Sequence, residues 1–428
     1  MEPKAKLYIP EVFRSFQGFQ IKDIKEWRKK REMELILESN SDRQHFCNRC
    51  GTEQGPQKER TLIRSRHQRM MGWTVVVCFW REKRYCPRCN KVRSERIDFL
   101  CPSSVHITKE LAWWINQLTC ETSVLAASRL ESLDKKTCYQ IDKYILQRFL
   151  EGYKIPKVTK ISVDEVYARG PKQQKEDETR DDLFFTVIVD IETHKVIYVS
   201  KSRRKEALDE FFILLGEEAC ENIKVVATDQ HEGYGASVKE YCKNATLVWD
   251  KFHLIQNFEK AVNNQRMQLH QEQIKGSDMS RLTRGQFRFL FLKKSTQRTE
   301  KEKEHIDNVL KTNERFAKLE IIKEKMLTFF YEKDIETARI CFDDLGDWIW
   351  QAGFGHLMDW YRNLDKGWNT LKNYFLYPVT TGISEGINRA IKGLKWQAYG
   401  YKDMDYFKLK ILQKCGYLNY RNLTLTHF

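Results

Sequence analysis

The middle of the chain contains five short runs of β-branched and apolar residues, each bounded by a polar turn. Runs of this length and composition are typical of buried β-strands. They occupy residues 160–168, 183–193, 194–200, 223–229 and 245–250. A stretch with apolar residues at helical spacing separates the third run from the fourth, and a shorter one separates the fourth from the fifth. This order of strands and helices predicts one mixed sheet with helices packed on it.

Two acidic residues occupy matching places in this predicted sheet. The order of elements is that of a ribonuclease H-like fold, in which the first and fourth strands lie side by side. Asp164 lies within the first strand and Asp229 ends the fourth, so we expect their carboxylates to face each other. A third acid, Glu385, lies in the first turn of a predicted helix. Arg389 and Lys392 follow on the same face of that helix, at i+4 and i+7.

Three acids that converge on one point repel one another unless a cation lies between them. Phosphodiester chemistry gives a reason to gather them, because two divalent ions about 3.5–4 Å apart can activate the attacking oxygen and stabilise the leaving one. Magnesium, or manganese in its place, suits such a site because magnesium prefers oxygen ligands. In this arrangement Glu385 binds metal, while Arg389 and Lys392 lie where they can contact a phosphate.

Two alternatives remain open for these acids. An aspartate at the end of a strand is most often a turn residue, and Asp229 taken alone would be interpreted in this way. Asp250 ends the fifth run and would take the role of the second acid if that run were the fourth strand. His253, three residues further on, could bind DNA or orient the site, although a buried histidine with satisfied hydrogen bonds is the commoner case.

Two Cys-x-x-Cys pairs lie in the first quarter of the chain. The residues are Cys47, Cys50, Cys86 and Cys89. One tight turn of this spacing presents two thiolates to the same ion, so two such turns complete a tetrahedral, structural zinc site. A ribbon of strands between the pairs would span the gap, whereas a redox role lacks the usual strand–helix context. Cys78 and Cys101 are spare candidates, and Cys101 could replace one of the four.

The residues after the second cysteine pair show the pattern of two predicted helices joined by a short turn, which is typical of a helix-turn-helix. Residues 123–130 would form the first helix, and Ser132 or Asp134 in the following turn can cap the next one. Residues 135–150 would be the recognition helix. The side chains expected to reach phosphates and base edges are Lys135, Lys136, Tyr139 and Gln140. An ordinary helical hairpin within a core is the alternative.

The chain is basic, with 74 lysines and arginines against 59 acids and a formal net charge of +15. Such a surplus favours a polyanionic partner, most simply nucleic acid, over a basic surface that serves only solubility. No apolar run approaches the ~18 residues of a membrane span, and the N-terminus lacks the apolar core of a signal peptide. We therefore expect no membrane partner, and we expect the cysteines to bind metal or lie buried rather than form disulfides.

Together these stretches resemble the ISL3 family of bacterial insertion-sequence transposases. The resemblance covers nearly the whole chain and is carried by the cysteine pairs, "SVDE", "VATDQHEGYGASVKE", "NATLVWDKFHLI" and "SEGINRAIKGLKWQAYGYKDMDYFKLKIL". It implies that Asp164, Asp229 and Glu385 form a catalytic DDE triad, and Lys392 fits the Glu-x6-Lys/Arg spacing of many such enzymes. The family often carries an asparagine near the terminal acid; here Asn388 follows Glu385.

The resemblance also implies an α/β fold: a ribonuclease H-like catalytic core with a helical insertion, behind a zinc ribbon and a helix-turn-helix. The segments are 1–104 (N-terminal segment and ribbon), 105–155 (helix-turn-helix), 156–250 (first part of the core), 251–378 (insertion) and 379–428 (C-terminal helices of the core). The implied activity is cleavage at the terminal inverted repeats of an insertion sequence and strand transfer into target DNA. The implied partners and cofactors are double-stranded DNA, Mg²⁺ or Mn²⁺, and structural Zn²⁺.

By analogy we expect a homo-oligomer, at least a dimer, in the bacterial cytoplasm at the nucleoid. Two alternatives to this function remain. One is a ribonuclease H-like nuclease, or a domesticated transposase, that cuts without joining. The other is a non-catalytic regulator that uses only the zinc and helix-turn-helix modules.

Overall fold

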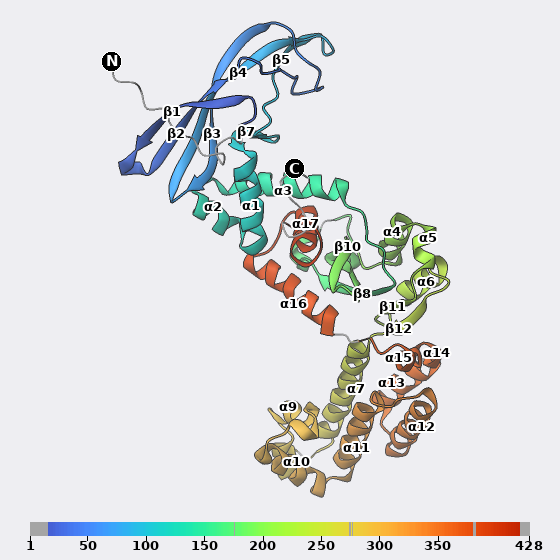
Figure 1. The fold of residues 1–428 in the computed structure, drawn as a ribbon. Coiled ribbons are helices and arrows are strands. Elements are labelled where there is room, and N and C mark those ends of the chain that lie inside the picture. Colours follow the sequence, from blue (N-terminus) through green and yellow to red (C-terminus); the bar gives the residue numbers. More distant parts are fainter. Residues whose placement is uncertain (1–15, 175, 274, 276, 380–381, 420–428) are drawn as a thin grey trace. The chain divides into compact units, whose positions relative to one another are not determined.

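The computed structural model describes residues 16–419 except 175, 274, 276 and 380–381 (Figure 1). Two compact units divide the chain: residues 1–154 with 393–428, and residues 155–392. The division falls within one helix, α16 (Gly382–Gln397). In the described part of the chain, no helix is long and apolar enough to cross a lipid bilayer. Short 3₁₀ turns lie at Arg28–Lys30, Pro171–Gln173, Arg180–Leu183 and Ser295–Gln297.

The first unit is built on a sheet with the strand order β1-β2-β4-β3-β7-β6, and β5 pairs with β4. The strands are β1 (Phe19–Trp27), β2 (Glu32–Ser39), β3 (Gln57–Met70), β4 (Trp73–Cys86), β5 (Lys91–Ser94), β6 (Leu100–Cys101) and β7 (Ser104–Thr108). The β3–β4 hairpin turns at Met71 and Gly72, whose φ angles are 48° and 81°. Positive φ at both turn residues matches the twist of the flanking strands. Edge-to-face contacts among Phe19, Phe79 and Phe99 form part of the core.

Three helices follow this sheet in the chain: α1 (Lys109–Glu121), α2 (Val124–Glu131) and α3 (Lys135–Gly152). The bounds of α2 and α3 agree with the two helices predicted at 123–130 and 135–150. Asp134 caps α3, because its carboxylate accepts a hydrogen bond from the Thr137 amide at 3.1 Å. Arg66 and Arg69 on β3 donate to backbone carbonyls at the end of α2, at 3.2 and 2.9 Å. These hydrogen bonds tie the helices to the sheet.

The last described helix, α17 (Met404–Cys415), belongs to the first unit, although we expected the residues from 379 onward in the catalytic core. It packs against α1 and α3. Asp142 of α3 is fully buried at this contact and lies 3.1 Å from the ammonium of Lys410. Its carboxylate also accepts hydrogen bonds from Asn116 (2.8 Å), Thr119 (2.6 Å) and Tyr406 (2.5 Å). The placement differs from the prediction because this polar network, which apolar periodicity does not reveal, fastens α17 to the neighbouring helices.

Asp142→Ala is expected to lower the free energy of unfolding of the first unit by about 3–5 kcal/mol. The substitution leaves the Lys410 ammonium, whose side chain is 3% exposed, without its counter-charge. Urea unfolding followed by circular dichroism measures the change. Glu151→Ala is the matched control, because Glu151 lies on the same helix but is 64% exposed; its loss costs at most about 1 kcal/mol. Equal losses for the two variants would contradict this account of the network.

The second unit contains the mixed sheet expected from the five apolar runs. Its strands are β8 (Lys160–Tyr167), β9 (Phe184–Asp190), β10 (Lys195–Ser200), β11 (Val225–Thr228) and β12 (Thr246–Trp249), and its helices before β12 are α4 (Lys205–Leu215), α5 (Glu217–Glu221) and α6 (Glu232–Tyr241). The strand order is β10-β9-β8-β11-β12. β8 and β11 are parallel neighbours, which confirms the predicted pairing of the first and fourth strands. The helical stretch predicted between the third and fourth runs is broken at Gly216, whose φ of 87° favours glycine.

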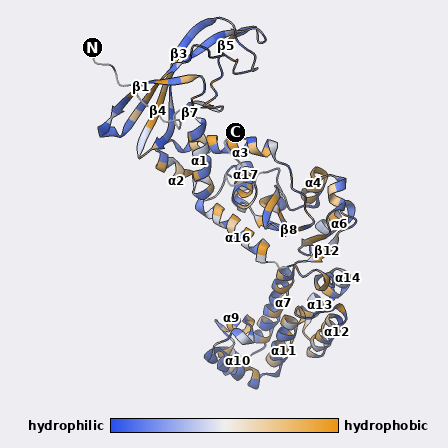
Figure 2. Ribbon diagram, in the orientation of Figure 1, coloured by the Kyte–Doolittle hydropathy of each residue, from blue (hydrophilic) through white to orange (hydrophobic). Residues whose placement is uncertain are grey.

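A group of helices follows β12 and has a core of its own. The helices are α7 (Lys251–Gln271), α8 (Asp278–Leu282), α9 (Phe287–Leu292), α10 (Glu300–Thr312), α11 (Glu314–Phe329), α12 (Ile335–Ala352), α13 (Gly355–Lys366), α14 (Trp368–Leu371) and α15 (Asn373–Leu376). Along these helices hydrophilic and hydrophobic residues alternate (Figure 2), as expected for helices buried on one side. The chain then returns to the sheet, where the Asn373 amide donates to the Leu247 carbonyl on β12 at 2.8 Å. Gly367 lies so close to Trp249 that a Cβ would come within 1.9 Å of its ring.

Candidate functional site

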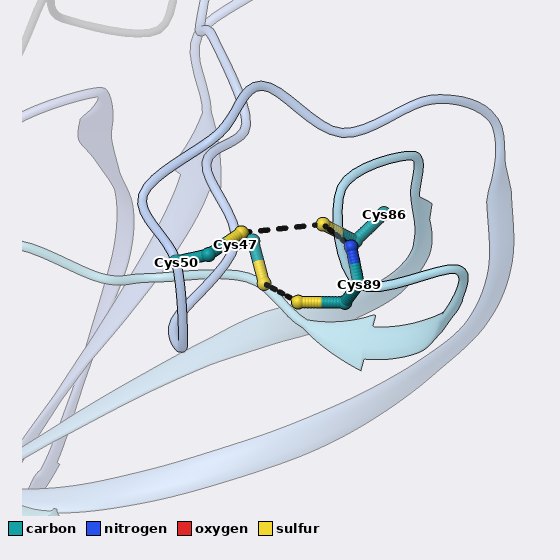
Figure 3. A group of neighbouring side chains, drawn as sticks. All are labelled: Cys47, Cys50, Cys86 and Cys89. Carbon is teal, nitrogen blue, oxygen red and sulfur yellow. Dashed lines mark hydrogen bonds between the residues drawn. The ribbon is translucent and has the colours of Figure 1, made fainter.

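The four predicted cysteines converge from two turns (Figure 3). The ligand atoms of Cys47, Cys50, Cys86 and Cys89 all lie within 4.8 Å of one another. Two of the sulfur–sulfur distances are 3.4 and 4.0 Å, close to the ~3.8 Å that Zn–S bonds of ~2.3 Å require in a tetrahedron. Hydrogen bonds with Thr52 lower the pKa of the Cys50 thiol to about 6, whereas the hydrogen bond with Cys50 raises the pKa of the Cys89 thiol to about 12, so it is the geometry of the four sulfurs that indicates a metal site. The cluster therefore fits a zinc ribbon.

A buried carboxylate supports the first cysteine turn. The Glu95 side chain is fully buried and pairs with the guanidinium of Arg43. It also lies 2.6 Å from Nδ1 of His45 and accepts a hydrogen bond from the Glu82 amide at 2.7 Å. Glu95 forms a backbone bridge with Cys47. The contacts of its side chain fix Glu95, and the backbone bridge between Glu95 and Cys47 in turn fixes the position of Cys47.

The two spare cysteines lie in other surroundings. The Cys78 thiol donates to the Glu34 carboxylate at 2.6 Å, in the interior of the sheet. The sulfur of Cys101 lies 3.1 Å from the Ser103 hydroxyl. Among the described residues, neither belongs to the group of four sulfurs.

Three aspartates lie at one level of the parallel part of the second sheet. Ala227 of β11 pairs with Ser162 of β8. Asp229 and Asp164 each come two residues later, so the same register brings them to the same level. Asp250 directly follows β12, which runs parallel to β11. The carboxylates are thus presented at the end where β11 and β12 stop.

Asp164 lines a cavity of about 260 Å³ together with residues from α7 and α16. The predicted residues around it are Asp250, His253, Glu385, Arg389 and Lys392. The amide of Asn388 donates to one oxygen of Asp164 at 2.6 Å, and Nε2 of His253 lies 3.4 Å from the other oxygen. The hydroxyls of Ser384 and Ser162 are 2.8 Å apart. These contacts hold the start of α16 against β8, so a helix distant in sequence completes the cavity.

Acidic and basic side chains both line the cavity. Burial raises the pKa of Asp250 to about 6. The hydrogen bond with Asp164 raises the pKa of His253, so the imidazolium form is favoured beside that carboxylate. Arg389 donates to Glu385 at 2.5 Å along the exposed side of α16. Asp164 and Glu385 thus already have cationic partners, which a divalent cation would have to displace. Among the described residues, the ligand atoms of the four cysteines lie within 4.8 Å of one another, whereas those of these acids do not form such a group.

Asp229 is not among the described residues that line this cavity. Its carboxylate accepts a hydrogen bond from the His231 amide at 3.0 Å, the bond expected of a turn-forming aspartate. Its charge nevertheless reaches Glu165, a cavity residue whose pKa is raised first by burial and then by Asp229. Glu165 also contacts the Tyr234 hydroxyl and the Arg203 guanidinium, each at 3.3 Å. Asp229 therefore accepts the hydrogen bond of a turn residue, and its charge also lies close enough to the cavity to raise the pKa of Glu165.

The predicted DNA-contacting residues of α3 have different surroundings. Lys135, Lys136 and Gln140 are exposed near the start of the helix. Tyr139 is half-buried, and its hydroxyl donates to the Asp403 carboxylate, which also pairs with Lys143. Three of the four predicted side chains are thus available to a ligand, whereas the Tyr139 hydroxyl is engaged within the first unit.

Two polar contacts of the cavity were not predicted. The sequence placed Asn388 near Glu385 but did not connect it with Asp164, although its i+3 position on the same helical face could have suggested a shared site. The contact of Glu165 with Tyr234 has no comparable signal, because it depends on how α6 packs on the sheet. The spacing of residues in the sequence therefore indicates which side chains of one helix share a site, but it does not indicate contacts between a helix and a strand of the sheet.

Comparison with known proteins identifies similar chains. A family model described as a transposase, DDE_Tnp_ISL3, matches residues 161–411, more than half of the chain. The transposase for insertion sequence element IS1001 from Bordetella parapertussis is 24% identical over 403 residues. That alignment covers 94% of this chain and 96% of the relative. The similarity thus extends over both units and not only over the cavity.

Proposed function

Because the chain belongs to the ISL3 family of transposases, we propose that it binds the terminal inverted repeats of its insertion sequence and catalyses DNA cleavage and strand transfer. The observation that carries this proposal is the cavity in which Asp164 and Glu385 meet basic residues. A mixed sheet with β8 beside β11 is compatible with a ribonuclease H-like core. We assign that fold to residues 156–250, completed by the start of α16, with 251–378 as its helical insertion.

We propose Asp164, Asp229 and Glu385 as the catalytic acids and metal ligands. Their carboxylate oxygens are the donors that Mg²⁺ or Mn²⁺ prefers. Asp164 and Glu385 line one cavity, which supports this fit, and a bound cation would replace His253 and Arg389 as their partners. Bound divalent metal would supply activation of the attacking oxygen and stabilisation of the leaving oxygen.

The remaining residues of the cavity position the acids and the DNA. Asn388 holds one oxygen of Asp164 and so fixes the direction of the other. Arg389 and Lys392 lie on successive turns of α16 after Glu385 and neutralise phosphates of the bound strand. Water acts first as the nucleophile and the freed 3′-hydroxyl acts second, so one set of positioning groups serves both steps.

Asp229 is preferred over Asp250 as the second acid. β11, which precedes Asp229, is the direct neighbour of the strand that carries Asp164, whereas β12 is one strand further away. Asp250 already caps α7 through a 2.7 Å bond from the Phe252 amide. Burial also raises its pKa to about 6, which disfavours the ionised form that a metal needs. We assign Asp250 and His253 an accessory role beside Asp164.

We propose that the first unit recognises DNA through the start of α3. Lys135, Lys136 and Gln140 are exposed there, on a helix whose N-terminus is capped by Asp134. Residues 1–104 would contribute the zinc ribbon and 105–155 the helix-turn-helix. Both ends of an insertion sequence must be joined, so the active form is proposed to be a homo-oligomer, at least a dimer.

Lys136→Ala is expected to weaken binding to double-stranded DNA and to reduce the dependence of affinity on salt. Each neutralised phosphate contributes about −0.9 to the slope of log K against log salt, so the slope should become about 0.9 less steep. Fluorescence anisotropy at several salt concentrations measures this. Lys301→Ala, an exposed lysine of α10, is the control and should leave the slope unchanged. The same slope for the wild type and Lys136→Ala would remove Lys136 from the DNA interface.

The proposed function is tested with purified protein and a DNA that carries the inverted repeats flanking the coding region. Magnesium is expected to support cutting at the repeat ends and joining of the released ends to a target plasmid. Cutting without joined product would indicate a nuclease. Binding without either product would indicate a regulator, and both results would overturn strand transfer as the activity.

A further inference from the structure

Two arginines in the group of helices after β12 are equally buried but have different partners. Arg266 on α7 and Arg298, which precedes α10, are each 7% exposed. Arg298 forms an ion pair with Glu320 at 2.6 Å, so its charge is balanced. Among the described residues, the Arg266 guanidinium donates only to the amide oxygen of Asn263, from Nε at 3.2 Å and from Nη2 at 3.1 Å. A buried charge without a counter-charge is costly and uncommon, so the surroundings of Arg266 call for an explanation.

One nitrogen of the Arg266 guanidinium is left for a ligand. Nη1 has no hydrogen-bond partner in the part of the chain that the structure describes, and it is not among the enclosed polar atoms there that lack one. It therefore reaches the surface while most of the side chain is covered. Because the bonds to Asn263 fix the plane of the guanidinium, Nη1 presents its hydrogens in a set direction, which favours a defined acceptor group.

Other basic side chains lie near Arg266. α9 packs against α7 (Figure 1), and Arg288 is exposed on α9. Burial lowers the pKa of Arg266, and the positive charge of Arg288 lowers it further. One turn after Arg266 on α7, Nδ1 of His270 lies 2.6 Å from the Thr283 hydroxyl, which brings the imidazole next to Arg284. The pKa of His270 is likewise lowered by burial and then by Arg266 and Arg284.

These basic residues have no acid of their own to balance them. In the described part of the chain, no acidic side chain acts on the pKa of Arg266 or of His270. Like charges held together repel one another unless an anion lies between them. We name Arg266, His270, Arg284 and Arg288 the α7–α9 cluster. All four residues belong to the second unit, so the cluster is a complete surface feature of that unit.

We propose that the α7–α9 cluster binds a phosphate group of the DNA backbone, with Arg266 as its buried donor and Arg288 as its exposed donor. This inference rests on the proposed function, which supplies DNA as the ligand, and it adds a contact outside the catalytic cavity. The planar guanidinium matches the oxygens of a phosphate. Phe289 is 71% exposed, and its ring centre lies 5.9 Å from the Arg288 guanidinium. The apolar sugar beside a backbone phosphate would cover this ring, whereas a free phosphate ion would leave it in water, so the surroundings favour DNA.

The experiment measures the affinity of the full chain for a duplex that carries one inverted repeat with its flanking DNA, by fluorescence anisotropy at several salt concentrations. Magnesium and manganese are omitted, so no cleavage occurs. Arg266→Gln is expected to bind this duplex about 10- to 100-fold more weakly, because a hydrogen bond to a charged group contributes on this scale. The slope of log K against log salt should become about 0.9 less steep. Arg288→Gln, at an exposed position, should change both quantities in the same direction.

Arg298→Gln is the matched control for burial. It leaves Glu320 without its partner, so it should lower the melting temperature and leave the DNA affinity of the folded protein unchanged. Arg266→Gln should not lower the melting temperature, because it removes a buried charge that has no counter-charge. If Arg266→Gln melted as early as Arg298→Gln and bound DNA as the wild type does, Arg266 would be a structural residue and the proposal would be overturned.

Two further outcomes would also overturn the proposal. One is equal affinity and equal salt slope for the wild type, Arg266→Gln and Arg288→Gln. The other is a melting temperature that inorganic phosphate raises in the wild type but not in Arg266→Gln, with equal DNA affinity, which would assign the cluster to a free phosphate ion. Cleavage assays with magnesium test the proposed function separately, so a chain that binds DNA through the cluster without cutting it would refute only that function.

Discussion

Asp164→Asn is expected to abolish DNA cleavage, with a loss of about a thousandfold or more, while binding of the DNA ends is retained. The substitution keeps the size of the side chain and its hydrogen-bond acceptor for Asn388, which donates at 2.6 Å. It removes the negative charge that both His253 and a bound divalent cation would face. Losses of this size are typical when a group that stabilises charge in the transition state is removed. Nicking of an end-bearing plasmid in magnesium measures the rate.

Two further variants separate the candidates for the second acid. Asp229→Asn is expected to lose as much activity as Asp164→Asn, because both are proposed metal ligands. Asp250→Asn is expected to lose only about 10- to 100-fold, the usual effect of a residue that supports a ligand. The reverse order would make Asp250 the second acid, and full cleavage by Asp164→Asn would refute the site.

The sheet and the four-cysteine cluster were predictable because both depend on local patterns. Each β-branched run corresponds to one strand, and β8 lies beside β11 as the order of elements requires. The two Cys-x-x-Cys turns impose their geometry over four residues each, so spacing alone indicated that Cys47 and Cys86 would share a ligand set. Asp164, Glu385 and Lys392 followed from strand position and helical spacing, and all three line one cavity.

Contacts between distant polar side chains were not predictable. Asp142 and Lys410 are 268 residues apart in sequence, and no periodicity connects them. Their buried contact nevertheless decides that α17 packs with the first unit. The hydrogen bond from Asn388 to Asp164 likewise depends on how α16 lies on β8. A periodic apolar pattern indicates which face of a helix is buried, but it does not indicate which buried polar groups meet.

The second large effect concerns the four-cysteine cluster and the zinc that we expect it to bind. Cys86→Ser is expected to lower zinc affinity by more than about a hundredfold, because loss of a direct ligand should exceed the effect of losing an outer partner. Cys86 is fully buried at the end of β4 and pairs with Lys91 of β5. Without metal, the two cysteine turns and β5 should lose their order, and binding to the DNA ends should weaken. The phenylalanine core around Phe79 lies in the sheet itself, so the remainder of the unit should stay folded.

Cys78→Ser is the matched control for this substitution. It makes the same chemical change in the same sheet, but Cys78 is bonded to Glu34 and lies outside the group of four. A serine hydroxyl can donate to Glu34 as the thiol does, so zinc should remain at one ion per chain. Zinc content by atomic absorption compares the two variants directly. Equal zinc in both would remove Cys86 from the ligand set, because a general destabilisation of the sheet would affect both variants while a lost ligand affects only one.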